Sequence, residues 1–206
     1  MVTNYQEAKS QNREALRRGL LDAASRVLVS EGLEALTMRR VSQEVAASTK
    51  VLYTLFGNKE GLLEQLYVEG FERLRRNLEA VPLSDDPVAD LVKVALAYRE
   101  NALADPTYFA VLFGRSVAGF TPSANSIEAA MSGFALLEGF VQRAMEAGLL
   151  RPADVKTSAK IVWATLHGAT SLELDGYFDD ADPSSRRQTY QLAVDTLIKG
   201  LSRFVS

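Results

Sequence analysis

Apolar residues recur every three to four positions along almost all of this 206-residue chain, and no stretch alternates apolar and polar residues as a half-buried strand would. This spacing places the apolar side chains on one face of a helix. Glycine, proline and capping residues interrupt the pattern repeatedly. The sequence therefore predicts an all-α protein of about nine helices.

The interruptions also predict where each helix lies. Residues 1–12 carry no apolar period, so we expect a flexible arm there. Helices are expected at about residues 13–31, 38–45, 49–56, 59–81, 88–104, 106–113, 124–147, 153–174 and 184–205.

Several classes of site are excluded by composition. The chain has no cysteine and a single histidine, His167, so disulfides, thiolate metal sites and zinc sites that need two imidazoles are ruled out. No G-x-S-x-G elbow is present for a Ser/His/Asp triad. We expect no metal, no cofactor and no catalytic site, and we expect His167 to be a hydrogen-bonded core or pocket residue.

The hydropathy pattern argues against a membrane protein. Apolar runs such as residues 161–164 fall short of the ~18 residues that a membrane span needs, and the polar N-terminal residues lack the apolar region of a secretory signal. We therefore expect a cytoplasmic protein.

Charge is distributed unevenly. The net charge is −3, but residues 1–60 hold nine Lys and Arg against seven Asp and Glu, while residues 61–206 hold the other 14 and 19. A basic end on an acidic body is typical of a protein that binds DNA at that end, because the local field matters more than the total.

Three consecutive short helices are expected to begin within residues 37–59, and each has a basic residue in its first turn. These basic residues are Arg39 and Arg40, Lys50, and Lys59. A cation at a helix N-terminus opposes the helix dipole, by about 0.3–1 kcal/mol. Such an arrangement favours a bound anion such as phosphate, and the alternative is a set of ordinary solvated charges.

The second of these helices has two different halves at ~100° per residue. The apolar half consists of Val51, Leu52, Leu55 and Phe56. The other half consists of Thr49, Lys50, Tyr53 and Thr54, whose side chains can hydrogen-bond to phosphates and base edges. The apolar half is expected to pack against the rest of the protein, and the other half is expected to contact a ligand.

Three motifs in this region are T-x-R-x-V at residues 37–41, L-Y-x-x-F at 52–56 and N-K-E-x-L-L at 58–63. Together they resemble the N-terminal helix-turn-helix of TetR-family transcriptional regulators over residues 13–71. The resemblance implies phosphate contacts by Thr37, Arg39, Tyr53 and Lys59, and a recognition helix that carries Ser48, Thr49, Lys50 and Thr54. It implies a DNA-binding domain at 13–58, with the helix-turn-helix at about 36–55, and a ligand-binding and dimerisation domain at 59–206.

The turn of this motif departs from the family pattern. The family usually has Gly-Val there, whereas this chain has Ala46-Ala47. If Ala46 must adopt a positive φ, the cost is about 1 kcal/mol.

The C-terminal part contains many aromatic residues, each of which could be core. As a set they resemble the lining of an effector cavity: Tyr67, Phe71, Tyr98, Tyr108, Phe109, Phe113, Phe134, Trp163 and His167. The sequence Trp163 with His167-Gly168 also resembles a Trp-His-Gly subclass of TetR C-terminal domains. The family dimerises through its last two helices, which implies an interface on the stripe formed by Tyr190, Val194, Leu197, Leu201 and Phe204.

These features predict a homodimeric repressor that binds double-stranded operator DNA and is released by a small apolar or aromatic effector. One alternative is a helical ligand-binding or enzymatic protein that does not bind DNA. Another is an activator, or a regulator without a small ligand.

Overall fold

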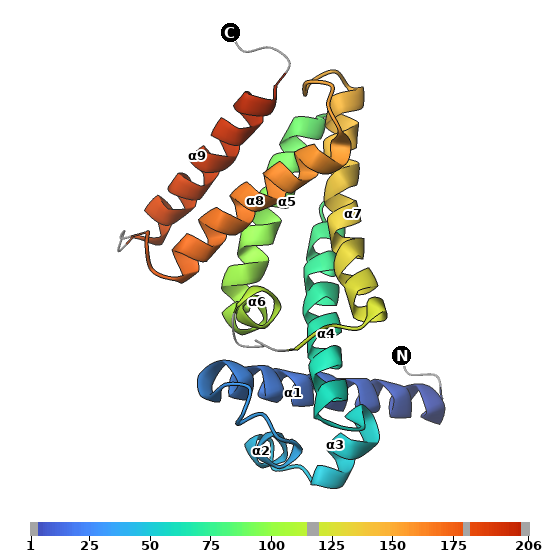
Figure 1. Ribbon diagram of the computed structural model, residues 1–206. Coiled ribbons are helices and arrows are strands. Elements are labelled where there is room, and N and C mark those ends of the chain that lie inside the picture. Colours follow the sequence, from blue (N-terminus) through green and yellow to red (C-terminus); the bar gives the residue numbers. More distant parts are fainter. Residues whose placement is uncertain (1–3, 115–119, 179–181, 203–206) are drawn as a thin grey trace. The chain divides into compact units, whose positions relative to one another are not determined.

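The structure is a computed structural model that describes residues 4–114, 120–178 and 182–202. In these residues the chain forms nine helices and no strand, apart from one isolated β-bridge between Leu150 and Ser202 (Figure 1). The predicted all-α fold is confirmed. None of the helices described is long and apolar enough to cross a membrane.

The helices are α1 (Tyr5–Glu31), α2 (Met38–Glu44), α3 (Thr49–Phe56), α4 (Lys59–Glu79), α5 (Pro87–Ala104), α6 (Pro106–Phe113), α7 (Ala124–Glu146), α8 (Val155–Leu174) and α9 (Pro183–Leu201). They form two compact units. Unit 1 comprises residues 1–71 and 107–128, and unit 2 comprises residues 72–106 and 129–206.

Helix α1 begins eight residues earlier than the sequence predicts, so the expected arm over residues 1–12 is wrong from Tyr5 onward. Asn4 caps the helix, because its Oδ1 accepts a hydrogen bond from the Glu7 amide at 2.9 Å. The first two turns are almost entirely exposed. They bury nothing, and for that reason they carry no apolar period although they are helical.

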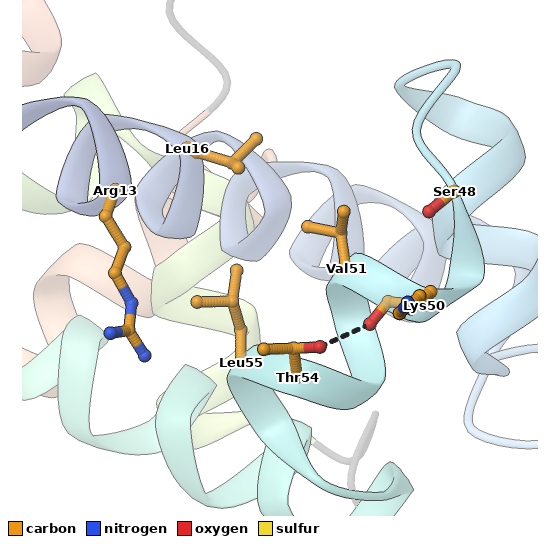
Figure 2. Close-up of a pocket in the computed structure, with 7 residues that line it drawn as sticks. All are labelled: Arg13, Leu16, Ser48, Lys50, Val51, Thr54 and Leu55. Carbon is orange, nitrogen blue, oxygen red and sulfur yellow. Dashed lines mark hydrogen bonds between the residues drawn. The ribbon is translucent and has the colours of Figure 1, made fainter. Parts of the chain in front are cut away.

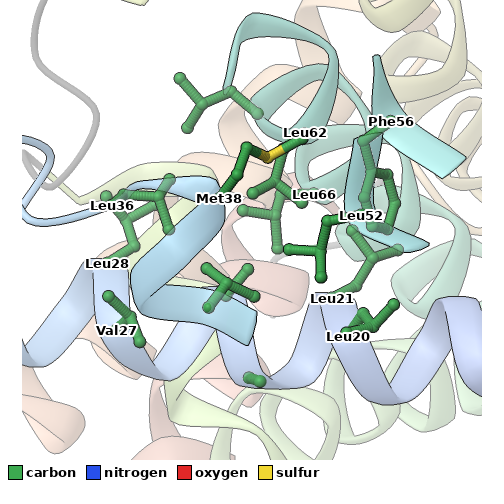
Figure 3. Close-up of a cluster of buried hydrophobic side chains, with 14 of the residues drawn as sticks. Leu20, Leu21, Val27, Leu28, Leu36, Met38, Leu52, Phe56, Leu62 and Leu66 are labelled. Atoms are coloured by element: carbon green, nitrogen blue, oxygen red, sulfur yellow. The ribbon is translucent and has the colours of Figure 1, made fainter. Parts of the chain in front are cut away.

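Unit 1 is built on one apolar core that α1, α2, α3 and the first turns of α4 share (Figure 3). Its fully buried members include Leu21, Leu28, Val41, Leu52, Leu62 and Leu66. Because α4 contributes to this core, unit 1 continues past residue 58, where the sequence-based division places the end of the N-terminal domain.

The connection from α3 to α4 is very tight. Gly57 ends α3 with a φ of 76°, and Asn58 caps α4 by accepting a hydrogen bond from the Gly61 amide at 2.8 Å. A Cβ atom at position 61 would collide with the Phe56 carbonyl oxygen. A side chain at residue 61 would therefore require this turn to shift.

Unit 2 holds α5, α8 and α9 together with buried polar contacts. Arg99 on α5 binds Glu173 on α8 through two hydrogen bonds of 2.6 and 2.5 Å, and both side chains are buried. The ring of Tyr190 on α9 lies 5.6 Å from the same guanidinium group, and its hydroxyl donates to the Ala95 carbonyl at 2.8 Å. These bonds fix which face of α9 turns inward.

A second buried carboxylate, Asp90, links the start of α5 to α7. It accepts hydrogen bonds from the Ser84 amide at 2.7 Å, from Lys93 at 3.0 Å and from Arg143 at 3.0 Å. The bonds from Ser84, Arg143 and Lys93 hold the pKa of Asp90 well below its usual range.

The predicted dimer stripe on α9 requires correction. Tyr190 and Val194 are buried within the protomer, so they belong to the core of unit 2 and are not available to a partner. Leu197 and Leu201 are half-buried, and Phe204 lies outside the described residues. The exposed apolar residues of α8 and α9 are instead Ile161, Trp163, Leu172 and Leu192.

Candidate nucleic-acid interface

Helix α2 begins at a threonine that caps it. Thr37 has an extended backbone, and its Oγ1 accepts a hydrogen bond from the Arg40 amide at 3.1 Å. This is the N-cap that the sequence predicts. Because Oγ1 only accepts in this bond, the hydroxyl hydrogen can still donate to a phosphate oxygen.

The turn between α2 and α3 is a Schellman motif with alanine at the position that glycine usually occupies. The Ala47 amide donates to the Ser42 carbonyl at 2.9 Å, and the Ala46 amide donates to the Gln43 carbonyl at 3.4 Å. Among the described residues, Ala46 is the one non-glycine residue with a positive φ, 52°. The strain that the sequence anticipates at this alanine is therefore present.

Helix α3 has one packed and one exposed half, as predicted. The packed residues are Val51, Leu52, Leu55 and Phe56. The exposed residues are Thr49, Lys50, Tyr53 and Thr54, with Tyr53 56% exposed. Thr54 donates its hydroxyl to the Lys50 carbonyl at 2.8 Å, whereas Ser48, the N-cap residue, makes no side-chain cap bond. Both hydroxyl oxygens can still accept a hydrogen bond from a ligand.

The basic residues at the start of α2 have different partners. Arg40 donates to Glu31 at 2.6 Å and to Glu44 at 2.9 Å, and so ties α2 to the end of α1. The Arg39 side chain is exposed and makes no hydrogen bond or ion pair with any described residue, and the same is true of the Lys50 side chain at the start of α3. Two cations of this face are thus free for a ligand.

Lys59 has an internal partner that the sequence does not reveal. Its Nζ donates to the Leu33 carbonyl at 2.6 Å, and the side chain is half-buried. The bond fastens the start of α4 to the segment that follows α1. Since an ammonium group has three donors, two remain for a phosphate, and Lys59 therefore combines a structural contact with a free charge.

Of the nine candidate effector residues, five lie in unit 1 and four lie in unit 2. The cluster in unit 1 contains Tyr67, Phe71, Tyr108, Phe109 and Phe113. Its ring centroids lie 4.8 Å apart for Tyr67 and Phe71, and 5.8 Å apart for Phe71 and Phe113. Phe120 joins this cluster 6.3 Å from Tyr67. The sequence does not identify Phe120, because it lies in a segment without any period.

The cluster in unit 2 contains Tyr98, Phe134, Trp163 and His167. The Tyr98 hydroxyl lies 3.0 Å from His167 Nδ1, and Phe134 and His167 lie 6.1 and 6.0 Å from the Trp163 ring. Burial raises the pKa of the Tyr98 phenol and lowers the pKa of His167. The phenol of Tyr98 and the neutral imidazole of His167 therefore share a hydrogen bond beside the exposed indole of Trp163.

These features define a helix-turn-helix DNA-binding protein: a capped short helix, a tight turn and a second helix with an exposed polar half. Comparison with family models agrees with this class. Residues 20–66 match the model of the bacterial regulatory proteins of the TetR family, and residues 91–197 match the tetracyclin repressor-like C-terminal domain. The chain belongs to the TetR family and is a DNA-binding transcriptional regulator. Proteins of this family bind operator DNA and act as dimers.

Individual relatives agree with the family. The HTH-type transcriptional regulator Rv1816 of Mycobacterium tuberculosis is 23% identical over 197 residues, covering 81% of this chain and 83% of that protein. The nicotine-responsive transcriptional repressor HdnoR of Paenarthrobacter nicotinovorans is 32% identical over 65 residues, or 32% of this chain and 34% of that protein. A solved protein of unknown function from Rhodococcus sp. RHA1 is 29% identical, with a TM-score of 0.76 over 91% of this chain and 96% of that one.

Proposed function

We propose that this regulator is a homodimeric repressor that leaves its operator when a small apolar or aromatic molecule binds the C-terminal bundle. The observation that carries the DNA-binding part is the exposed half of α3, where hydroxyl groups surround the unpaired Lys50. The repressor part is supported by the tetracyclin repressor-like match of residues 91–197 and by the small-molecule response in the name of HdnoR.

The DNA-binding residues divide by the part of DNA that each contacts. In our proposal Thr37, Arg39, Tyr53 and Lys59 bind backbone phosphates. Ser48, Thr49, Lys50 and Thr54 lie at the start and along the exposed half of α3, and they contact base edges in the major groove.

Tyrosine variants test the phosphate contacts. Tyr53→Phe removes one exposed hydroxyl and should weaken binding to every DNA sequence alike, because phosphates carry no sequence information. Tyr177→Phe removes an exposed hydroxyl from unit 2 and should change nothing. The measurement is fluorescence anisotropy on the DNA that flanks the gene and on an unrelated duplex. Equal affinity of wild type and Tyr53→Phe for both duplexes would refute this role of Tyr53.

Variants of Lys50 test base recognition. Lys50→Ala should change the ratio of the affinities for those two duplexes, because it alters contacts that distinguish bases. If Lys50→Ala weakens both by the same factor, Lys50 binds phosphate instead.

We place the dimer interface on the exposed faces of α8 and α9. Ile161 and Leu172 are each 46% exposed on one side of α8, and Leu192 is 64% exposed on α9. Gly168 lies between the two α8 residues on that side, and no protomer atom lies near the position of a Cβ added there. A partner helix that approaches closely would explain a glycine that costs up to about 1 kcal/mol in mid-helix.

A matched pair of charge substitutions tests this interface. Leu192→Glu should produce monomers in light scattering, because a charge buried in a dimer without a partner is costly. Leu83→Glu, at a residue that is 62% exposed but outside α8 and α9, should leave the dimer intact. A dimer that persists in Leu192→Glu would exclude the interface from this part of α9.

The effector is best sought through Trp163, which is the only tryptophan of the chain. Its fluorescence therefore reports directly on the cluster with Tyr98, Phe134 and His167. A library of small aromatic compounds can be titrated for quenching, and each quencher can then be added to the protein bound to operator DNA. We expect compounds that quench also to release the DNA. Compounds that saturate Trp163 and leave DNA affinity unchanged would contradict ligand release through this cluster.

A further inference from the structure

The first part of helix α1 lies outside the segment that matches the TetR family model, because the match begins at residue 20. In this part, Arg13 lines one side of a groove between α1 and α3. We infer that Arg13 binds a backbone phosphate of the DNA that receives α3, and that the groove between α1 and α3 accepts the adjoining deoxyribose. This inference rests on the proposed function, because it requires that α3 face DNA.

The groove lies within unit 1 and has a volume of about 300 Å³. Its lining consists of Arg13, Leu16, Ser48, Lys50, Val51, Thr54 and Leu55 (Figure 2). Figure 2 shows Arg13 of α1 and Lys50 of α3 at opposite sides, with Leu16, Val51 and Leu55 between them. The Arg13 guanidinium beside an aliphatic floor suits a sugar–phosphate chain, whose phosphates are anionic and whose sugar carbons are apolar.

The position of Arg13 follows from the helical period of α1. Leu20, Leu16 and Arg13 are spaced by four and three residues, so they lie on one face of the helix. Leu20 is buried in the core of unit 1, Leu16 is exposed over the groove, and Arg13 comes next toward the N-terminus. The face that packs against the helix-turn-helix thus ends in a guanidinium group.

Neighbouring arginines of α1 have acidic partners, whereas Arg13 has none in the part of the chain that the structure describes. Arg17 binds Glu14 at 2.9 Å and Glu69 at 2.7 Å, and Arg18 binds Glu14 at 2.9 Å. The Arg13 side chain makes no hydrogen bond or ion pair with any described residue. Its charge is therefore uncompensated at the groove.

The groove also contains no acidic side chain that could repel a phosphate. Its other polar members are the hydroxyls of Ser48 and Thr54 and the ammonium of Lys50. Charge complementarity thus identifies a polyanion as the occupant, and the residues that the groove shares with the proposed recognition helix identify that polyanion as the DNA bound by α3.

The experiment measures the salt dependence of DNA affinity for Arg13→Gln. The probe is a mixed-sequence duplex of about 30 base pairs, long enough for two half-sites one helical turn apart. Each lost phosphate contact should reduce the slope of log K against log[NaCl] by about 0.9. At about 0.1 M salt this corresponds to about eightfold weaker binding per protomer, or about 60-fold for a dimer that loses two contacts.

Two further variants separate a direct contact from a general effect of charge. Arg18→Gln removes one positive charge from the same helix, and it should leave the slope unchanged. Arg13→Lys keeps the charge and should keep most of the slope. If Arg13→Gln and Arg18→Gln lower affinity equally, long-range charge explains the result and the contact is refuted.

A second duplex of unrelated sequence distinguishes phosphate from base contacts. Equal losses on both duplexes support the backbone contact, whereas a loss on only one would assign Arg13 to base recognition and overturn the proposal. Wild-type protein without any salt-dependent affinity would instead refute the proposed function itself. If wild-type protein binds DNA and Arg13→Gln shows the same slope of log K against log[NaCl], this inference alone is refuted.

Discussion

The strained turn between α2 and α3 leads to a counterintuitive prediction: replacing Ala46 with glycine should stabilise the protein. Ala46 is held at a φ of 52° by the two hydrogen bonds of the Schellman motif. A Cβ in the left-handed region crowds the following carbonyl, at a cost of about 1–2 kcal/mol. Glycine has no Cβ and avoids this cost.

The magnitude is the difference between two opposing terms. Removing the strain stabilises the native state by about 1–2 kcal/mol, while the greater freedom of glycine stabilises the unfolded state by about 0.4–1 kcal/mol. Ala46 is exposed, so no packed methyl group is lost. At the midpoints of the two ranges the net gain is about 0.8 kcal/mol, which corresponds to about 2–3 °C in Tm for a chain of this length.

The neighbouring alanine provides the matched control. Ala47 has no positive φ and packs partly against the core of unit 1. Ala47→Gly therefore relieves no strain in the native state and only increases the freedom of the unfolded state. It should lower the free energy of unfolding by at least about 0.4–1 kcal/mol. The two variants have the same composition but should shift Tm in opposite directions.

Thermal and urea unfolding at equal protein concentration measure both effects, since the Tm of a dimer depends on concentration. If Ala46→Gly is no more stable than wild type, the strain argument is refuted. If Ala46→Gly is more stable but binds DNA less tightly, the rigidity of the alanine turn contributes to DNA recognition.

Four further substitutions test other parts of the structure. Gly61→Ala places a Cβ against the Phe56 carbonyl oxygen and should lower stability by about 1–3 kcal/mol. The Cβ of Gly19→Ala contacts no other atom, and this substitution should raise stability by up to about 1 kcal/mol. Urea unfolding measures both changes. Because the pKa of His167 is lowered in the folded state, stability is complete above pH of about 6.5 and falls as the pH drops below it; Tm measured from neutral to mildly acidic pH should show a smaller decline in His167→Gln. Arg40→Gln should lower Tm and leave the salt slope of DNA binding unchanged, because Arg40 binds protein carboxylates.

The helices were predictable wherever burial and capping coincide. Asp86, Asp154 and Asp182 cap α5, α8 and α9 close to the expected starts. The first turns of α1 were not predictable in the same way, because they bury no side chain and so show no period. Their residues are nevertheless good helix formers, and that propensity was the available signal.

The dimer stripe shows the limit of periodicity for a single helix. The stripe through Tyr190 and Val194 is real, but it faces α5, where the Tyr190 hydroxyl meets the Ala95 carbonyl. A period shows that one face of α9 is apolar and does not show which neighbour covers it. The opposite face carries Leu192, which a search for periodic apolar residues overlooks.

The internal partner of Lys59 and the free charge of Arg13 were also beyond the sequence. Both depend on which atoms approach after folding: the Leu33 carbonyl reaches Lys59 across 26 positions in the chain, and no carboxylate of the residues described pairs with Arg13. Residue type indicates that a cation is present. Only the fold decides whether that cation is already neutralised.

This distinction explains how a chain with a net charge of −3 can present a surface for DNA. In unit 1 two arginines that join helices to one another are paired with carboxylates, Arg17 with Glu69 and Arg40 with Glu31. Arg39 and Lys50, in contrast, have no partner among the described residues. Paired charges contribute little to the field outside the protein, so a phosphate responds mainly to the unpaired ones. Which cations lack a partner is therefore a better guide to where a polyanion binds than the charge of the whole chain.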